Sequence, residues 1–152
     1  MPEEPERIII LMADDDDDDY VLAKKAWDHS KLLNPLKRVS DGEQLLDYLR
    51  NKGEYSDIEE YPTPGLILLD LNMPIKDGRE ALKEIKSDDD LRKIPVVVFT
   101  TSKAEEDILK TYDLGVNSFI TKPVTFKSLV QVVESLGKYW FEIVSLPNYE
   151  TK

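Results

Sequence analysis

Two kinds of segment alternate along the chain. Short and nearly continuous apolar runs occur at residues 7–13, 36–39, 65–70, 95–100 and 118–121. Segments with the apolar spacing of helices follow them, at residues 19–33, 43–52, 78–87, 104–114 and 125–141. Strands that alternate with helices and are apolar throughout are typical of a parallel sheet covered on both faces. The pattern therefore predicts an α/β fold, a doubly wound (βα)5 sandwich with a five-stranded parallel sheet.

The length of the chain, 152 residues, allows one domain with a proper hydrophobic core. We expect this domain at residues 7–141, after an N-terminal extension at 1–6 and before a C-terminal tail at 142–152. Residues 51–64 form a long polar connection that a minimal domain of this kind does not need. This connection and the tail are candidate partner-binding elements, although long connections are more often tolerated surface insertions.

The last helical segment has a wide apolar surface. On a helical wheel, one arc contains Phe126, Leu129, Val130, Val133, Leu136 and Trp140, and a flank adds Val132, Tyr139 and Ile143. A helix that covers one face of a sheet needs a narrower arc. The flank is therefore either covered by the C-terminal tail or exposed for another chain.

The charge and the composition exclude several classes of function. The formal net charge of -11 disfavours binding to nucleic acid and to anionic membranes. The acidic N-terminus and the absence of any long apolar run predict a cytoplasmic protein that does not enter a membrane. The sequence has no cysteine, so any metal must be bound by oxygen ligands.

Polar residues follow the predicted strands at their carboxyl ends, where parallel α/β sheets bind ligands. They are Asp14 and Asp15 after the first strand, Asp70 after the third, Thr100 and Thr101 after the fourth, and Lys122 after the fifth. Three carboxylates and one amine in a small cleft suit a hard cation such as Mg²⁺. A bound cation would relieve the repulsion among the acids and could hold the oxygens of a phosphoryl group.

The remaining residues of interest have structural interpretations. Asp16 to Asp19 are predicted to form the N-cap and first turn of the first helix. His29, the single histidine, is expected on the surface or in helix packing rather than in catalysis. Trp27 is expected at the rim of the core, with contact to a partner protein as the alternative.

Four short motifs stand in order at these strand ends. They are "MADDD", "LILLDLNMPIKDG", "VVFTTS" and "FITKP". Together they resemble the receiver domain of two-component response regulators, which has a flavodoxin-like fold, over residues 7 to 140. The resemblance implies that Asp70 is the phosphoacceptor, and that Thr100 and Lys122 bind the phosphoryl oxygens. It also implies Mg²⁺ bound directly by Asp15, Asp70 and the backbone carbonyl of Asn72, with Asp14 acting through water.

The same resemblance implies further roles. Asn72 and Ser102 would tune the lifetime of the phosphoryl group, and the Lys122-Pro123 bond would be cis. Phosphorylation would draw the Thr100 hydroxyl toward Asp70 and let Phe119 turn inward, as an aromatic switch. The packing of the fourth helix, fifth strand and fifth helix would then change between two states.

The resemblance also implies partners. The phosphoryl group would come from the phosphohistidine of a sensor histidine kinase, and the chain would catalyse only its own phosphotransfer and dephosphorylation. The acidic run, the connection at 51–64 and the segment "KYWFEIVSLP" are similar to single-domain regulators partnered with bacterial phytochrome kinases. Such relatives imply a homodimer through the fourth helix, fifth strand and fifth helix, where the expected contact residues are Val132, Leu136, Tyr139 and Ile143.

Two other functions stay open at this point. A Mg²⁺-dependent phosphohydrolase with an aspartyl-phosphate intermediate would place D-x-D after the first strand, which the aspartate run satisfies. Such enzymes carry a cap domain, for which this chain has no room. The phosphohydrolase interpretation also gives Asp70 no role. A scaffold whose binding does not depend on phosphorylation would bind its partners equally well after Asp70→Asn.

Overall fold

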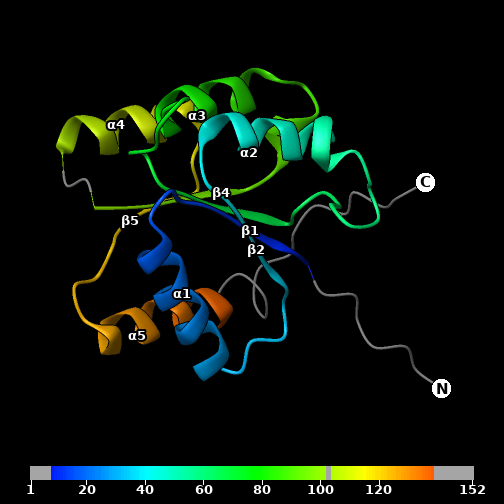
Figure 1. The fold of residues 1–152 in the computed structure, drawn as a ribbon. Helices are drawn as coiled ribbons and strands as arrows, with labels where there is room; N and C mark the ends of the chain where they lie inside the picture. The colour runs from blue at the N-terminus through cyan, green and yellow to red at the C-terminus, as the bar shows by residue number, and fades with distance from the viewer. Residues whose placement is uncertain (1–7, 102–103, 139–152) are drawn as a thin grey trace.

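The computed structural model describes residues 8–101 and 104–138, and it contains one parallel sheet (Figure 1). The strand order is β2-β1-β3-β4-β5, with every neighbouring pair parallel. The strands are β1 Ile10–Ala13, β2 Leu36–Val39, β3 Leu66–Leu69, β4 Val96–Thr100 and β5 Ser118–Thr121. The three central strands are buried along their whole length, as their continuous apolar runs predict. The predicted doubly wound α/β fold is confirmed.

Helices cover both faces of the sheet (Figure 1). They are α1 Asp17–His29, α2 Gly42–Leu49, α3 Gly78–Ser87, α4 Glu105–Leu114 and α5 Phe126–Leu136. Two short 3₁₀ helices, η1 Gly53–Tyr55 and η2 Leu91–Lys93, lie in the connections. Helices α1 and α5 share one face, and α2, α3 and α4 share the other. The sheet therefore separates two apolar layers.

The helix ends have local causes. Asp16 caps α1 by accepting a hydrogen bond from the Asp19 N–H at 3.1 Å, and Asp17 to Asp19 lie in the first turn. This confirms the predicted structural role of Asp16 to Asp19. Helix α1 ends at His29, four residues before the predicted end, because Lys31 has a left-handed backbone with φ 58°. Asn51, with φ 52°, similarly follows the end of α2.

The connection at 51–64 packs onto α2 through three aromatic rings. The rings of Tyr48, Tyr55 and Tyr61 lie 5.0 to 5.5 Å from one another. The Tyr48 hydroxyl donates to the Pro62 carbonyl oxygen at 3.1 Å, and Asn51 Nδ2 donates to the carbonyl oxygens of Tyr55 and Tyr61. Much of this connection is therefore an anchored part of the domain, and its role in partner binding stays a prediction.

Helix α5 buries part of its predicted apolar arc, while Phe126 at its start is 42% exposed. Leu136 keeps 6% of its exposure and packs with Leu129 and Val133 in the apolar layer beneath α1. The prediction that Leu136 lies on a dimer or partner face is therefore wrong, because this side chain is part of the core. Val132 is half-buried against the same layer. Tyr139, Ile143, the extension at 1–6 and the tail at 142–152 lie outside the described residues.

Helix α1 places Trp27 in this layer and His29 on the surface. Trp27 keeps only 2% of its exposure, and its Nε1–H donates to the Asn34 carbonyl oxygen at 2.8 Å. It lies inside the core rather than at the predicted rim, and its burial leaves no surface for a kinase. His29 is exposed and touches the Phe126 ring edge-on, with 6.4 Å between the ring centres. The expected surface or packing role of His29 is confirmed.

Candidate functional site

Three carboxylates meet at the carboxyl ends of β1 and β3. Oxygen atoms of Asp14, Asp15 and Asp70 all lie within 4.8 Å of one another. The sheet fixes them, because the N–H of Asp70 donates to the Ala13 carbonyl oxygen and the N–H of Asp14 donates to that of Val39, each at 3.0 Å. Asp14 and Asp70 are buried, and Asp15 is exposed. This donor set has the hard oxygen ligands that Mg²⁺ and similar divalent ions prefer.

Lys122 provides the positive charge nearest to these acids. Its Nζ donates to Asp14 at 2.6 Å, to Asp19 at 2.7 Å and to Asp70 at 3.2 Å, which uses all three ammonium donors. The backbone N–H of Lys122 donates to the Thr100 carbonyl oxygen at 2.7 Å, so β4 positions this residue. The predicted convergence of Asp14, Asp70 and Lys122 is present in the structure.

Burial and pairing act on these charges in opposite directions. Burial raises the pKa of Asp14, and the hydrogen bond from Lys122 lowers it by less. Burial would lower the pKa of Lys122, but its hydrogen bonds to Asp14 and Asp19 outweigh this effect and raise the pKa. Lys122 therefore stays protonated, while its single charge does not offset the cost of ionising the buried Asp14. A divalent cation bound here would supply the missing charge.

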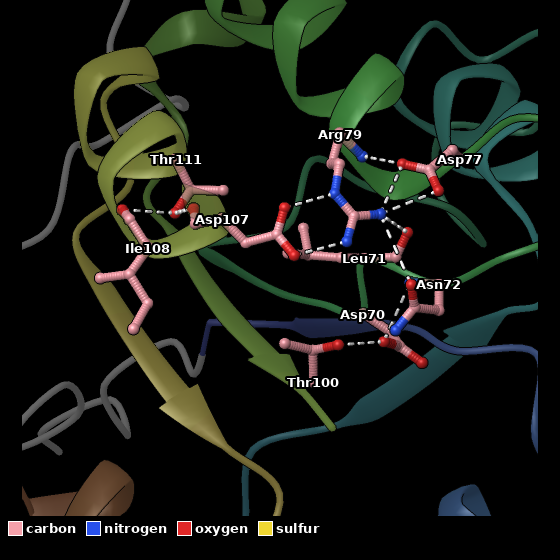
Figure 2. Close-up of polar contacts among 9 residues, drawn as sticks. All are labelled: Asp70, Leu71, Asn72, Asp77, Arg79, Thr100, Asp107, Ile108 and Thr111. Atoms are coloured by element: carbon pink, nitrogen blue, oxygen red, sulfur yellow. Dashed lines mark hydrogen bonds and ion pairs between the residues drawn. The ribbon is translucent and has the colours of Figure 1, made fainter. Parts of the chain in front are cut away.

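The two carboxylate oxygens of Asp70 accept hydrogen bonds from different residues. Its Oδ1 accepts hydrogen bonds from the Thr100 hydroxyl at 2.7 Å and from the Asn72 N–H at 3.2 Å (Figure 2). Its Oδ2 accepts the bond from Lys122. These donors would also be in reach of a group attached to Asp70.

The contact of Thr100 changes the expected switch. We expected phosphorylation to draw the Thr100 hydroxyl toward Asp70, but the hydroxyl of this fully buried residue already donates to Asp70 in the unmodified protein. That inward movement is therefore not required. Phe119 is half-buried against the apolar layer of α2, α3 and α4, and its N–H donates to the Tyr112 hydroxyl of α4 at 3.1 Å.

The Lys122-Pro123 bond corrects another expectation. The described residues contain no cis peptide bond, so the predicted cis isomer is wrong for this structure. The trans form is intrinsically favoured even before proline. The trans chain also brings the Lys122 ammonium to its three carboxylates. Ser102, predicted to tune the lifetime, lies outside the described residues.

The start of α3 packs directly on the loop that follows Asp70. The Gly78 N–H donates to the Leu71 carbonyl oxygen at 3.0 Å, and a Cβ at Gly78 would lie 2.2 Å from the Asp70 carbonyl oxygen. Only glycine fits this approach without a shift of the backbone. The glycine that follows "KD" in the sequence therefore serves the site as well as the turn.

The sequence interpretation missed two contacts of the site. Asp19 was predicted only as part of the first turn of α1, but it is also a partner of Lys122. Its place one helical turn after Asp15 could have indicated this. Arg79 pairs with Asp107, and their separation of 28 positions left no signal in the sequence.

The chain was then compared with known proteins. A family model described as the response regulator receiver domain matches residues 10–134. The chain belongs to the response regulator receiver family. Response regulator Rcp1 of Synechocystis sp. is 44% identical over 127 residues, which cover 84% of this chain and 81% of Rcp1. A receiver domain uses an aspartate after its third strand, where Asp70 lies, whereas a phosphohydrolase would give Asp70 no role. The phosphohydrolase alternative is therefore not favoured.

Two solved structures resemble this receiver closely. The phosphorylated cyanobacterial phytochrome response regulator RcpA has a TM-score of 0.87 and 42% identity, covering 94% of this chain and 100% of RcpA. The Mn²⁺-bound form of Rcp1 has a TM-score of 0.84 and 42% identity, covering 93% of this chain and 99% of Rcp1. The receiver thus accepts a phosphoryl group in two-component signalling, and its relatives include phytochrome response regulators.

In the described part of the receiver, no helix has the length and the apolar character that crossing a bilayer requires.

Proposed function

We propose that Asp70 is the residue that accepts the phosphoryl group, from the phosphohistidine of a sensor histidine kinase. The main support is the environment of the Asp70 carboxylate: Thr100 donates to one oxygen, and Lys122 donates to the other. Asp14 and Asp15 stand within 4.8 Å as metal ligands. No other carboxylate in the described residues combines burial at a strand end with these three kinds of neighbour.

The transfer needs little covalent chemistry from the protein. An Asp70 oxygen attacks phosphorus, the P–O bond forms, the P–N bond to histidine breaks, and the imidazole keeps the electron pair and takes a proton from solvent. Positioning and neutralisation of charge supply most of the catalysis of such steps. Thr100 and Lys122 would hold the phosphoryl oxygens. Water later cleaves the acyl phosphate, and the receiver acts on no other substrate.

The metal would be Mg²⁺, bound by Asp15, Asp70 and the carbonyl oxygen of Asn72, with Asp14 acting through water. Bound there, the ion would neutralise charge on the phosphoryl oxygens. Asn72 is exposed beside Asp70, where its side chain would influence the access of water. Asn72 and Ser102 would therefore set the lifetime of the phosphoryl group rather than the ability to accept it.

The signalling partner would be a bacterial phytochrome kinase. This proposal is supported by the similarity to RcpA and by the net charge of -11, which disfavours nucleic acid as a target. Phosphorylation would act through Phe119 and the surface of α4, β5 and α5. A homodimer through this surface, with contacts from Val132, Tyr139 and Ile143, would be the form that responds.

The central test is the incubation of the wild type and Asp70→Asn with acetyl phosphate and Mg²⁺, followed by intact mass measurement. We expect the wild type to gain the mass of one phosphoryl group and Asp70→Asn to gain none, because the amide is not a nucleophile. Removal of Mg²⁺ with a chelator should abolish the gain in the wild type. Phosphorylation of Asp70→Asn to the wild-type level would overturn the assignment.

A further inference from the structure

Arg79 joins α3 to α4 by a two-bond ion pair. Its Nε donates to Asp107 Oδ1 at 2.7 Å, and its Nη2 donates to Asp107 Oδ2 at 2.6 Å (Figure 2). The Asp107 side chain keeps 14% of its exposure. Parallel pairing of this kind, with one partner largely buried, is stronger and more specific than an ordinary surface ion pair. It fixes the distance and the orientation between the two helices.

The third guanidinium nitrogen of Arg79 faces the loop after Asp70. Its Nη1 donates to Asp77 at 3.0 Å and has longer contacts with the Leu71 carbonyl oxygen at 3.4 Å and with Asn72 Oδ1 at 3.5 Å. The N–H of Asn72 in turn donates to Asp70. Figure 2 shows that these contacts form one continuous path from Asp70 through Arg79 to Asp107.

Helix α4 differs from the other four α-helices of the described residues in that its N-cap residue makes no side-chain capping bond. In the described part of the chain, α1, α2, α3 and α5 each begin with a side chain that accepts a backbone N–H, from Asp16, Asp41, Asp77 and Thr125 respectively. The N-cap residue of α4 is Ala104, whose side chain makes no capping bond. Asp107 lies in the first turn of α4, so its pairing with Arg79 fixes this turn from outside the helix.

The same turn follows closely on β4. Thr100, the last residue of β4, donates to Asp70. The first turn of α4 is connected to Asp70 through Asp107, Arg79 and Asn72. Its position depends on contacts that converge at the phosphoacceptor.

We propose that Arg79 is a positioning residue that couples the phosphorylation site to α4. It holds the first turn of α4 to the loop after Asp70, so a change at Asp70 alters the order of that turn. The proposal rests on the proposed role of Asp70 as the phosphoacceptor. It assigns to Arg79 and Asp107 the transmission of the signal.

The test is a double-mutant cycle with wild type, Arg79→Gln, Asp107→Asn and the double variant. Amide hydrogen exchange is measured by NMR at Asp107 and Ile108, whose N–H groups donate to the Ala104 carbonyl oxygen. Each protein is measured alone and with Mg²⁺ and beryllofluoride, and binding of the mimic is followed by fluorine NMR. The cycle is needed because Asp107→Asn also weakens the interaction with the helix dipole.

Asp28→Asn is the matched control. It removes a carboxylate of the same type from the exposed Lys24–Asp28 pair on α1, which has no contact with the site. This variant should exchange at Asp107 and Ile108 like the wild type. Circular dichroism checks that each variant is folded.

We expect either single substitution to raise the exchange rate of the two amides about fivefold, by loss of one charge-assisted pair. The double variant should exchange no faster than the faster single variant. In the wild type, beryllofluoride should change these rates, and in Arg79→Gln this response should be lost.

Several results would overturn the proposal. They are exchange rates in the single variants equal to those of the wild type, effects that add in the double variant, or a wild-type response to beryllofluoride that persists in Arg79→Gln. If the wild type binds beryllofluoride but the exchange rates of its Asp107 and Ile108 amides do not change, the proposed coupling is also wrong. A wild type that binds no beryllofluoride would instead contradict the proposed function. The exchange rates measured without the mimic would then still test the Arg79–Asp107 pair.

Discussion

At the scale of single residues, the most informative contact is between Asp19 and Lys122. Three carboxylates share one ammonium group, and the shortest bonds go to Asp14 and Asp19 rather than to Asp70. Asp19 thus draws the ammonium toward α1 and away from Asp70. Without Asp19, the ammonium would rest more fully on Asp14 and Asp70, which are the carboxylates that a metal needs.

We therefore predict that Asp19→Asn weakens Mg²⁺ binding. The dissociation constant should rise roughly threefold, because one anion is lost and Lys122 competes more strongly for the metal ligands. Isothermal titration calorimetry measures the constant. Asp18→Asn is the control, since it removes the same charge from an adjacent exposed position in α1. An equal rise in both variants would show that only net charge matters and would contradict a specific role for Asp19.

The sequence predicted residues whose position follows from strand order, and it failed where side chains reach across the fold. Asp14, Asp70, Thr100 and Lys122 stand at strand ends, so the parallel topology alone brings them together. The rotamer of Asp19 and the isomer of the Lys122-Pro123 bond depend on tertiary contacts. Leu136 was placed on the wrong surface because a helical wheel cannot tell burial beneath α1 from burial beneath a partner.

At the scale of elements, the tyrosine cluster determines how the 51–64 connection is held. Burial raises the pKa of Tyr48 from 10.0 to about 12, and it also raises the pKa of Tyr55. A folded-state pKa above the unfolded value means that the unfolded state loses its proton first as the pH rises. The contribution of Tyr48 to stability is then complete below pH 10.0 and is lost as the pH rises toward about 12.

This gives a prediction for alkaline conditions. Titration of tyrosinate absorbance should show a late phase that is smaller in Tyr48→Phe than in the wild type. Urea denaturation should show that the wild-type free energy of unfolding falls between pH 10.0 and about 12. The same fall should be reduced in Tyr48→Phe, which cannot ionise at this position. A titration in which all tyrosines ionise together near the ordinary pKa would contradict the burial of Tyr48 in solution.

At the scale of the whole molecule, the proposed partner surface of α4, β5 and α5 includes elements from both faces of the sheet. Helices α1 and α5 form one layer and α2, α3 and α4 the other, so α4 and α5 meet the solvent on opposite sides of β5 (Figure 1). On α4, Leu109 is 62% exposed and Tyr112 is 47% exposed. An apolar surface of this kind on α4 is consistent with the proposed dimer.

We predict that the receiver dimerises with Mg²⁺ and beryllofluoride and that Leu109→Lys prevents it, because a charge would be buried in the interface. Sedimentation velocity gives the oligomeric state. Leu33→Lys is the control, because Leu33 is 69% exposed and lies after α1, outside the proposed surface. A wild type that sediments as a monomer with and without the mimic would remove the proposed dimer.

The partnership of Lys122 with Asp14 also constrains how the protein is made. The two residues are 108 positions apart, and β5 is the last strand to be synthesised. The acids that follow β1 and β3 are therefore synthesised before their ammonium partner. Until β5 docks, repulsion among them opposes the pairing of the central strands, and a divalent ion from the medium can relieve it. Magnesium should accordingly speed refolding in proportion to its occupancy of the acids, even where no kinase is present.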